Sequence, residues 1–320
     1  MTLRINSMRL SPRLMLVVTV LACAAFAQEE QPSSPTPTAA PAPPESNSPI
    51  LLKPDANGVV PADQIRALLL QAEVKDLENH RRLRDYTYIE RQEEHKLDGH
   101  GDVAKTEIRT SEVLRIAGEQ VEKLIAKDDK PLSEDEAKKE DEKIQKIIDK
   151  RKNESEEDQR KRAAKEEKDR EEDRKFVLET ADAFNFRLVG SELVDGRDTW
   201  VLEGEPRQGF EPKHKDAKLL SKFRGRVWID KAESQWVKLD ISAIDTISFG
   251  LFLARIHKGA RIVVDLTKVN EEVWLPKQVQ VRVVVRVGLV KNYREEVEQT
   301  FRDYKKFRAE SKMTVLGETK

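Results

Sequence analysis

QVQVRVVVRVGLV, residues 278–290, is the stretch of the sequence that decides the fold class. Its apolar residues recur at every second position and would share one face of a strand: Val279, Val281, Val283, Val285, Val287 and Leu289. The polar residues between them are Gln278, Gln280, Arg282 and Arg286. Because successive side chains of a β-strand point to opposite faces, this alternation predicts a strand with one apolar face. The sheet that contains it must bury a continuous apolar wall.

Further strands are predicted on both sides of this one. From Phe186 to residue 308, strand-like segments follow one another with short turns, for example at Gly196 and Asn270, and with no helix between them. Upstream, residues 86–116 alternate about a turn at residues 99–101, and QVEKLIAKD predicts a third strand. Short connections without helices indicate an antiparallel meander, here of about ten strands.

Only one segment with a helical apolar stripe is available to cover this wall. It begins at Pro61, which suits the first turn of a helix, and runs to about Leu83 with apolar residues at helical spacing, namely Ile65, Leu68, Leu69, Ala72 and Leu77. A helix shields ~10 Å of width, whereas strands ~4.8 Å apart make a ten-stranded sheet far wider. The sequence therefore predicts an α+β fold. Its large antiparallel sheet curls into a half-barrel around an N-terminal helix and leaves an apolar groove.

A long charged segment interrupts the strands. Ser133 and Glu136 form a capping box, and residues 133–175 contain neither Gly nor Pro and few apolar residues. Many Glu–Lys and Glu–Arg pairs support a solvated, projecting helix that breaks near residues 153–155. We therefore expect a helical insertion, residues 133–182, between two parts of the half-barrel at residues 61–132 and 183–308. Deleting residues 133–175 should leave the fold intact.

The first 60 residues predict export and a spacer. Three arginines precede the short apolar run LMLVVTVLACAAFA, which is typical of a signal peptide of residues 1–27 with cleavage before Gln28. Alternatively, the run VLAC would make Cys23, the only cysteine, a lipidated N-terminus. Residues 28–60, rich in Pro, Ala and Ser, predict an extended linker, and residues 309–320 a tail. We therefore expect a periplasmic protein with no transmembrane span once the signal is removed.

Composition and motifs exclude several function classes. The 58 Lys and Arg residues nearly cancel the 59 Asp and Glu residues, so no overall basic field favours nucleic acid. The five histidines show none of the spacings of a metal site. There is no nucleophile elbow and no glycine-rich phosphate loop. We expect no enzyme, no cofactor and no metal.

The order of these segments is similar to that of a known group of proteins. An exported chain with an amphipathic helix, antiparallel strands and the hairpin FRGRVWIDKAESQWVKLDISAID resembles the periplasmic outer-membrane lipoprotein-sorting proteins and related sensor domains, the LolA/LolB/RseB-like group. Segments such as KFRGRVWIDK and DTISFGLFLARIHKG make it most similar to a secreted bacterial branch of that group. The resemblance covers about residues 61–307 apart from the charged insertion, and it implies a half-barrel with an apolar cavity for acyl chains.

The candidate groove-lining residues come from three segments. The stretch DTISFGLFLARIHKGARI, residues 245–262, is apolar on both strand faces, which fits a buried strand, a groove-lining flap or a membrane contact. Together with the covering helix and the valine strand, it supplies the predicted lining: Leu68, Leu69, Phe249, Leu251, Leu253, Val281, Val283 and Val285. A lipid, an acyl chain or a lipoprotein is the ligand class we expect there, for a carrier or a sensor.

Two tryptophans give a second candidate surface. On simple alternation Trp228 and Trp236 would share the outer face of the sheet, as a cross-strand pair or as a patch for a ligand or partner. This patch, or the charged helix, would serve an envelope adaptor that binds another protein. The sequence leaves the carrier or sensor and the adaptor as alternatives. An elongated apolar cavity favours the first, and a filled interior favours the second.

Overall fold

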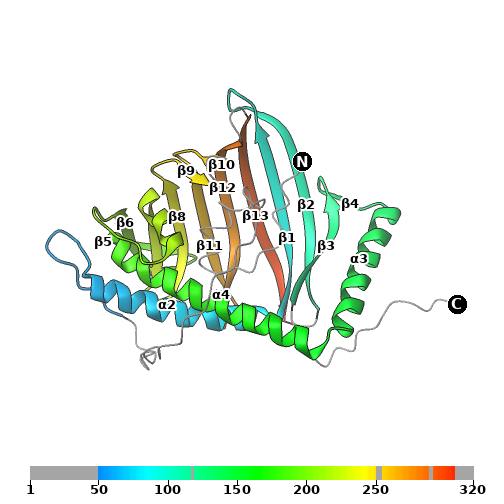
Figure 1. Ribbon diagram of the computed structural model, residues 1–320, viewed down its shortest axis with the longest axis horizontal. Helices are drawn as coiled ribbons and strands as arrows, with labels where there is room; N and C mark the ends of the chain where they lie inside the picture. Colours follow the sequence, from blue (N-terminus) through cyan, green and yellow to red (C-terminus); the bar gives the residue numbers. More distant parts are fainter. Residues whose placement is uncertain (1–49, 117–118, 250–253, 288–290, 307–320) are drawn as a thin grey trace.

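The structure, a computed structural model, describes residues 50–116, 119–249, 254–287 and 291–306. In this part of the chain, thirteen strands form one antiparallel sheet that does not close into a barrel. Helices α2 and α4 run across the lower end of one face, which we call the inner face, and α3 stands beside one edge (Figure 1). The α+β half-barrel that the sequence predicts is confirmed.

The order of strands across the sheet is β4-β3-β2-β1-β13-β12-β11-β8-β7-β6-β5, with the short hairpin β9–β10 attached to β12. Ten strands have eight or more residues, in agreement with the predicted number. They are β1 Tyr86–Leu97, β2 Val103–Ile116, β3 Glu119–Lys127, β5 Phe184–Val194, β6 Arg197–Pro206, β7 Phe223–Asp230, β8 Trp236–Ala243, β11 Arg261–Val269, β12 Val273–Val287 and β13 Lys291–Lys306. The three short strands are β4 Lys130–Pro131, β9 Ile247–Phe249 and β10 Ala254–Ile256.

Most neighbouring strands are also neighbours in the chain, because tight turns connect them. There are two exceptions in the main strand order: β8 pairs with β11, and at the centre of the sheet β1 pairs with β13. A side-chain hydrogen bond between Gln299 and Glu90 joins these strands across a separation of 209 residues. The first and the last strand of the described chain are therefore neighbours in the middle of the sheet.

Helix α2, Ala62–Leu83, is the predicted covering helix. Pro61 occupies its N-cap position, where the missing N–H of proline costs nothing. Ile65 and Leu68 are each 2% exposed, and Ala72 and Leu83 are buried as well. This stripe follows the spacing seen in the sequence, and it faces the sheet.

The charged segment forms two helices that meet at the predicted break. Helix α3, Glu134–Lys152, begins at the predicted capping box of Ser133 and Glu136 and packs on β3 through the buried Ile144. Helix α4, Glu156–Ala183, extends back across the inner face beside α2 (Figure 1). Its last turns bury Phe176 and Ala181. Helix α4 thus covers the inner face together with α2, whereas the sequence predicted only one covering helix.

One row of side chains crosses the inner face of nine strands and defines its two halves. From β5 to β2, the paired residues are Phe186, Gly204, Gly225, Ile241, Ile262, Val281, Val297, Glu94 and Glu107. We call β5 to β8, β11 and β12 the apolar half, and β13, β1 and β2 the acidic half. The outer face of the apolar half is charged, since Arg226 pairs with Glu203 at 3.0 Å and Arg261 with Asp240.

The predicted signal peptide, most of the predicted linker and the predicted tail lie outside the described residues. Within the described ranges, none of the helices has the length and apolar character needed to cross a membrane.

Candidate functional site

A cavity of about 210 Å³ lies between α2, α4 and the apolar half of the inner face. Its lining is almost entirely apolar. Helix α2 contributes Ile65, Leu68, Leu69 and Ala72, α4 contributes Phe176 and Val177, and the strands contribute Phe184, Phe186, Leu202, Phe223, Val227, Ile229, Trp236, Leu239, Ile241 and Ile262. Such a lining suits an apolar ligand and offers few directional contacts.

The floor of the cavity contains two glycines that face each other on adjacent strands. Gly204 of β6 pairs with Gly225 of β7. A Cβ at Gly225 would lie 2.5 Å from the carbonyl oxygen of Asp240, and one at Gly204 would lie 3.0 Å from Cε1 of Phe186. Neither position accepts a side chain without a shift of its neighbours. Phe186 and Ile241 approach the two glycines closely, so glycine is needed at these positions to let their side chains pack over the floor.

The volume of the cavity limits the size of the ligand that can enter it. An apolar cavity of ~150 Å³ engineered into another protein takes up one benzene molecule. At about 210 Å³, this cavity has room for one slim apolar group, such as a single alkyl chain segment. It is too small for the several chains of a whole lipid.

The 3-10 helix η1, Lys215–Lys222, closes one end of the cavity with Leu220. This segment is held against α4 by an imidazole–carboxylate contact of 2.7 Å between Nε2 of His214 and Oε2 of Glu172. The backbone N–H of Lys213 also donates to Glu179 of α4 at 3.0 Å. The end wall is thus attached to the helix that forms the roof.

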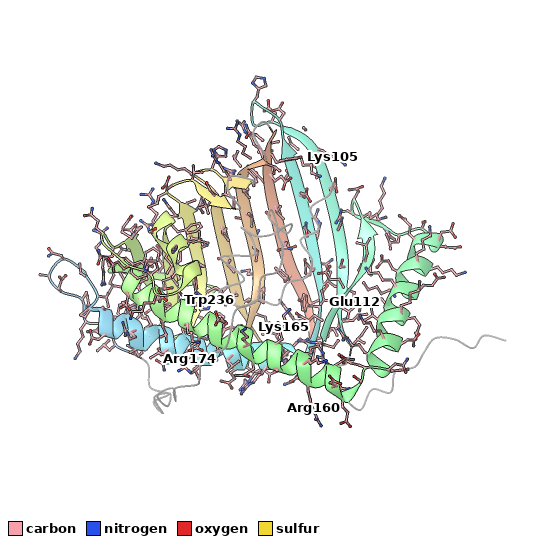
Figure 2. The ribbon with its side chains drawn as sticks, viewed as in Figure 1. Lys105, Glu112, Arg160, Lys165, Arg174 and Trp236 are labelled. Atoms are coloured by element: carbon pink, nitrogen blue, oxygen red, sulfur yellow. The ribbon has the colours of Figure 1, made fainter. Side chains whose placement is uncertain are left out.

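Two acidic residues of α2, Glu73 and Asp76, also line the cavity. Nε of Arg174 on α4 lies 3.3 Å from Oε2 of Glu73. Burial nevertheless raises the pKa of Glu73 above its ordinary value, an effect that the nearby Arg174 only partly offsets. Figure 2 shows Arg174 in the region where α2 and α4 run beside each other across the lower end of the sheet.

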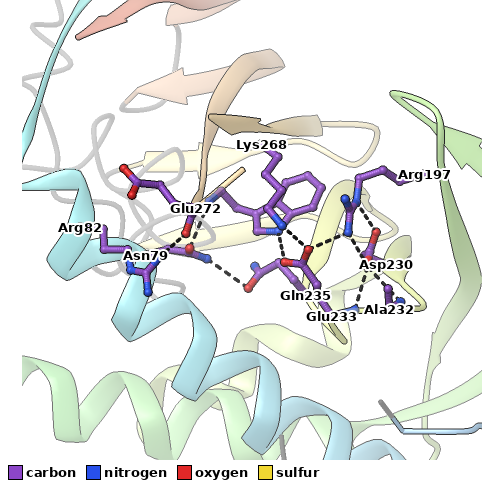
Figure 3. Close-up of polar contacts among 10 residues, drawn as sticks. Asn79, Arg82, Arg197, Asp230, Ala232, Glu233, Gln235, Lys268 and Glu272 are labelled. Carbon is purple, nitrogen blue, oxygen red and sulfur yellow. Dashed lines mark hydrogen bonds and ion pairs between the residues drawn. The ribbon is translucent and has the colours of Figure 1, made fainter. Parts of the chain in front are cut away.

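A polar network holds α2 on the turns at the lower end of the sheet (Figure 3). Asn79 accepts the backbone N–H of Trp274 at 3.1 Å and donates to Gln235 at 3.2 Å. Glu233 accepts the indole N–H of Trp274 at 2.9 Å and pairs with Arg197 at 2.7 Å. These contacts join α2 to the turns after β7 and β11, and they fix the roof of the cavity.

The predicted lining residues separate into three groups. Leu68 and Leu69 line the cavity. Val281, Val283 and Val285 lie further along the same face, in clusters with residues of β11 and of the β9–β10 hairpin, and outside the cavity lining. Phe249 lies in β9, although its side chain is outside the described part. Leu251 and Leu253 fall outside the described residues.

The structure places Trp228 and Trp236 on opposite faces of the sheet. A register shift between Trp228 and Ile229 makes Ile229 pair with Trp236, so the alternation expected from the sequence is displaced by one residue. Trp236 consequently lines the cavity on the inner face. The indole of Trp228 donates to Glu192 at 2.8 Å on the outer face. The two tryptophans do not form one outer patch.

Sequence reasoning did not identify the glycine pair or its aromatic neighbours Phe184, Phe186 and Phe223. A signal for the glycines was present, because Gly204 and Gly225 each interrupt an otherwise regular strand pattern. Glycine inside a strand often marks a close approach of a ligand or of another backbone.

The acidic half has a different chemistry. Burial and the neighbouring Glu122 raise the pKa of Glu90 to about 7. Burial, together with Glu94 and Glu107, also raises the pKa of Glu295. Within the ranges that the structure covers, no group of three or more His, Cys, Asp or Glu side chains could hold a metal ion.

No family model matches the sequence, and neither does any curated protein. Among solved structures, the chain is similar to a DUF1329 family protein from Desulfovibrio piger, at 12% identity and a TM-score of 0.29, over 76% of this chain and 92% of that one. A LolA superfamily protein from Nitrosomonas europaea gives 8% identity and a TM-score of 0.24, over 76% and 93% of the two chains. The Pseudomonas aeruginosa MucA/MucB complex gives 10% and 0.23, over 77% and 99%.

The LolA superfamily name is that of the group expected from the sequence. At such TM-scores, the similarity says nothing of a ligand, a partner or the role of any residue.

Proposed function

We propose that the protein is a non-enzymatic carrier or sensor of the cell envelope that binds one alkyl or acyl chain in the cavity beneath α2 and α4. The observation that carries this proposal is the apolar-lined cavity of about 210 Å³ between the two covering helices and the sheet. A sheet covered by two helices would normally fill this space with side chains, because empty volume loses packing contacts. Here the surrounding side chains leave about 210 Å³ open.

The apolar walls of the cavity suit an alkyl chain better than a polar metabolite. Phe176, Phe184 and Phe223 line the cavity and are each less than a tenth exposed. Burying one methylene against such a surface contributes about 0.8 kcal/mol. A chain of about eight methylenes therefore gains about 6 kcal/mol from burial, from which the entropic cost of association is subtracted.

A larger side chain that fills part of the cavity tests the proposal. Leu69 lines the cavity and is only partly buried, so Leu69→Trp should occupy the space without breaking the core. We expect uptake of a fluorescent fatty acid to fall at least about tenfold. The melting temperature should stay the same or rise, because filling a cavity commonly adds about 0.5 to 1 kcal/mol. The control is Leu193→Trp, which adds the same side chain at a position that is 75% exposed.

Two results would contradict the proposal. One is a wild-type protein that takes up no chain at any concentration below the solubility limit of the probe. The other is equal uptake by the Leu69→Trp and Leu193→Trp variants, which would place the probe elsewhere on the molecule.

A further inference from the structure

The walls of the cavity differ in how far water reaches them. On α2, the lining residues Leu69, Glu73 and Asp76 follow one another at helical spacing, and all three are partly exposed. By contrast, Leu220 of η1 is 2% exposed and Phe223 of β7 is 4% exposed. The stripe on α2 therefore borders the entrance of the cavity, and the residues around Leu220 form its closed end.

The closed end is backed by packed side chains. Leu220 belongs to a buried cluster with Phe176, Ala183, Phe184 and Ala217. Both alanines of this cluster are at most 1% exposed, so their small side chains lie in tightly packed surroundings. A chain that reaches Leu220 finds no further space behind it.

The segment that carries Leu220 is also fixed in position. His214, the residue before η1, contacts Glu172 of α4 at 2.7 Å. The backbone N–H of Lys213 donates to Glu179 of the same helix at 3.0 Å. These two contacts tie the end wall to the roof of the cavity, and a fixed wall stops every chain at the same depth.

The volume of the cavity sets how many carbon atoms fit between the entrance and this wall. A dry cavity of ~150 Å³ holds benzene, which has six carbon atoms. By proportion, about 210 Å³ holds about eight carbon atoms. An amphiphile that enters tail first leaves its polar end at the α2 stripe, where water hydrates it. Further carbon atoms would stay at the entrance and gain little from burial.

We infer that the cavity selects amphiphiles by chain length, with a limit of about eight carbon atoms, and that Leu220 determines this limit. This rests on the proposed function, since the chain would occupy the cavity described above. It adds which chains bind and which side chain stops them.

Calorimetric titration of the full-length protein with linear 1-alkanols, from hexanol to dodecanol and each below its solubility limit, tests the limit itself. A buried methylene contributes about 0.8 kcal/mol, which corresponds to about a fourfold gain in affinity. We expect this gain for each carbon atom up to about the eighth. For longer alkanols the gain should fall below about twofold per carbon atom.

Two variants test the role of Leu220. Leu220→Ala removes three side-chain carbon atoms from the closed end, so the break in the affinity series should move to chains about two or three carbon atoms longer. Leu220→Val removes one carbon atom, disturbs the core less, and should move the break by about one. Leu219→Ala is the matched control, because Leu219 lies in the same 3-10 helix, is partly buried against a different cluster and does not line the cavity.

The control should keep the break at about eight carbon atoms. Melting curves verify that each variant is folded at the temperature of the titration.

The outcomes separate the two claims. If none of the alkanols binds to the wild type, the proposed function fails. If affinity keeps rising about fourfold per carbon atom up to dodecanol, the cavity holds a chain, but the inference of a length limit is overturned. A break that stays at the same length in both Leu220 variants, or that moves equally in Leu219→Ala, overturns the role of Leu220.

Discussion

The two halves of the inner face follow the same alternation and are stabilised in different ways. In the apolar half, side chains such as Ile262, 5% exposed, and Leu202, 1% exposed, are covered by neighbouring elements and gain free energy by burial. In the acidic half, the same row continues as Glu94 and Glu107, and Lys96 lies between them at 3.2 Å and 3.1 Å. Here, cross-strand ion pairs replace apolar contacts.

The alternation of residues along each strand determines which side chains share a face. Whether a cavity can form on that face depends on whether those side chains are apolar or charged. An apolar half needs helices over it, and an imperfect fit between helices and sheet leaves a dry space. A charged half satisfies its groups along the sheet itself. The border between them passes through β12 and β13, where Val281 pairs with Val297 and Val297 pairs with Glu94.

The largest effect is expected from a charge placed in the apolar half. Ile262→Glu should cost about 3 to 5 kcal/mol, because a carboxylate would be buried without a partner. Gln92→Glu is the matched change in the acidic half, where Gln92 faces Arg109 across the sheet, and it should cost less than about 1 kcal/mol. Urea unfolding of both variants measures the difference. Equal costs would show that the two halves do not differ in polarity.

A second prediction concerns Glu90 in the acidic half. Its pKa is raised from 4.5 to about 7 in the folded protein, so the folded state holds the proton more tightly than the unfolded state. The wild type therefore loses stability as pH rises from about 4.5 to about 7. Glu90→Gln removes this loss. We expect no gain at pH 4 and a gain of at most about 3 kcal/mol at pH 8.

Melting temperatures of both proteins across this pH range measure the effect. Glu93→Gln on the opposite face of β1 is the control, since Glu93 pairs with Arg91 at 2.8 Å. A difference between Glu90→Gln and wild type that does not change with pH would contradict the pKa of about 7.

A third prediction tests the border itself. Val283 is partly buried and pairs with Glu295 across the strands, so Val283→Asp places a second carboxylate beside one whose pKa burial already raises. The cost should be about 1 to 2 kcal/mol, less than for Ile262→Glu, because water reaches this position. Val283→Asn, the uncharged counterpart, should cost less at neutral pH. If Val283→Asp lost as much stability as Ile262→Glu, Val283 would be an interior part of the apolar half, and the border would lie further towards the acidic half.

The smallest effect is expected on the outer face. Arg226, whose side chain is 51% exposed, pairs with Glu203 in a charged row between strands. Arg226→Gln should change the free energy of unfolding by no more than about 0.5 kcal/mol, and salt should reduce the change further. A loss above about 1 kcal/mol would mean that the outer row contributes to the fold as strongly as the border does.

Much of the architecture could be predicted from the sequence. The valine alternation of β12 indicated a one-sided strand, and the spacing from Ile65 to Ala72 indicated the covering helix. The run of charged residues after Ser133 indicated helices that break near residue 153. Each of these patterns depends on neighbours in the chain, so local physical rules suffice.

The cavity could be predicted only in part. Its position depends on which strands lie under α2 and α4, and on a register shift that moves Trp236 to the inner face. Both result from contacts between distant segments. The second cover was also missed, because most of α4 is charged and its docking depends on a few residues near Phe176.

The pairing of β1 with β13 has a consequence for how the protein reaches its native state. The strand that completes the centre of the sheet is the last strand among the described residues, and it bonds to a strand about 200 residues earlier. Until it arrives, β1 and β12 each present an unpaired edge that can join another chain. Pairing across so long a separation in the chain is slow, and a chain in which β13 has not yet paired is the species most exposed to aggregation.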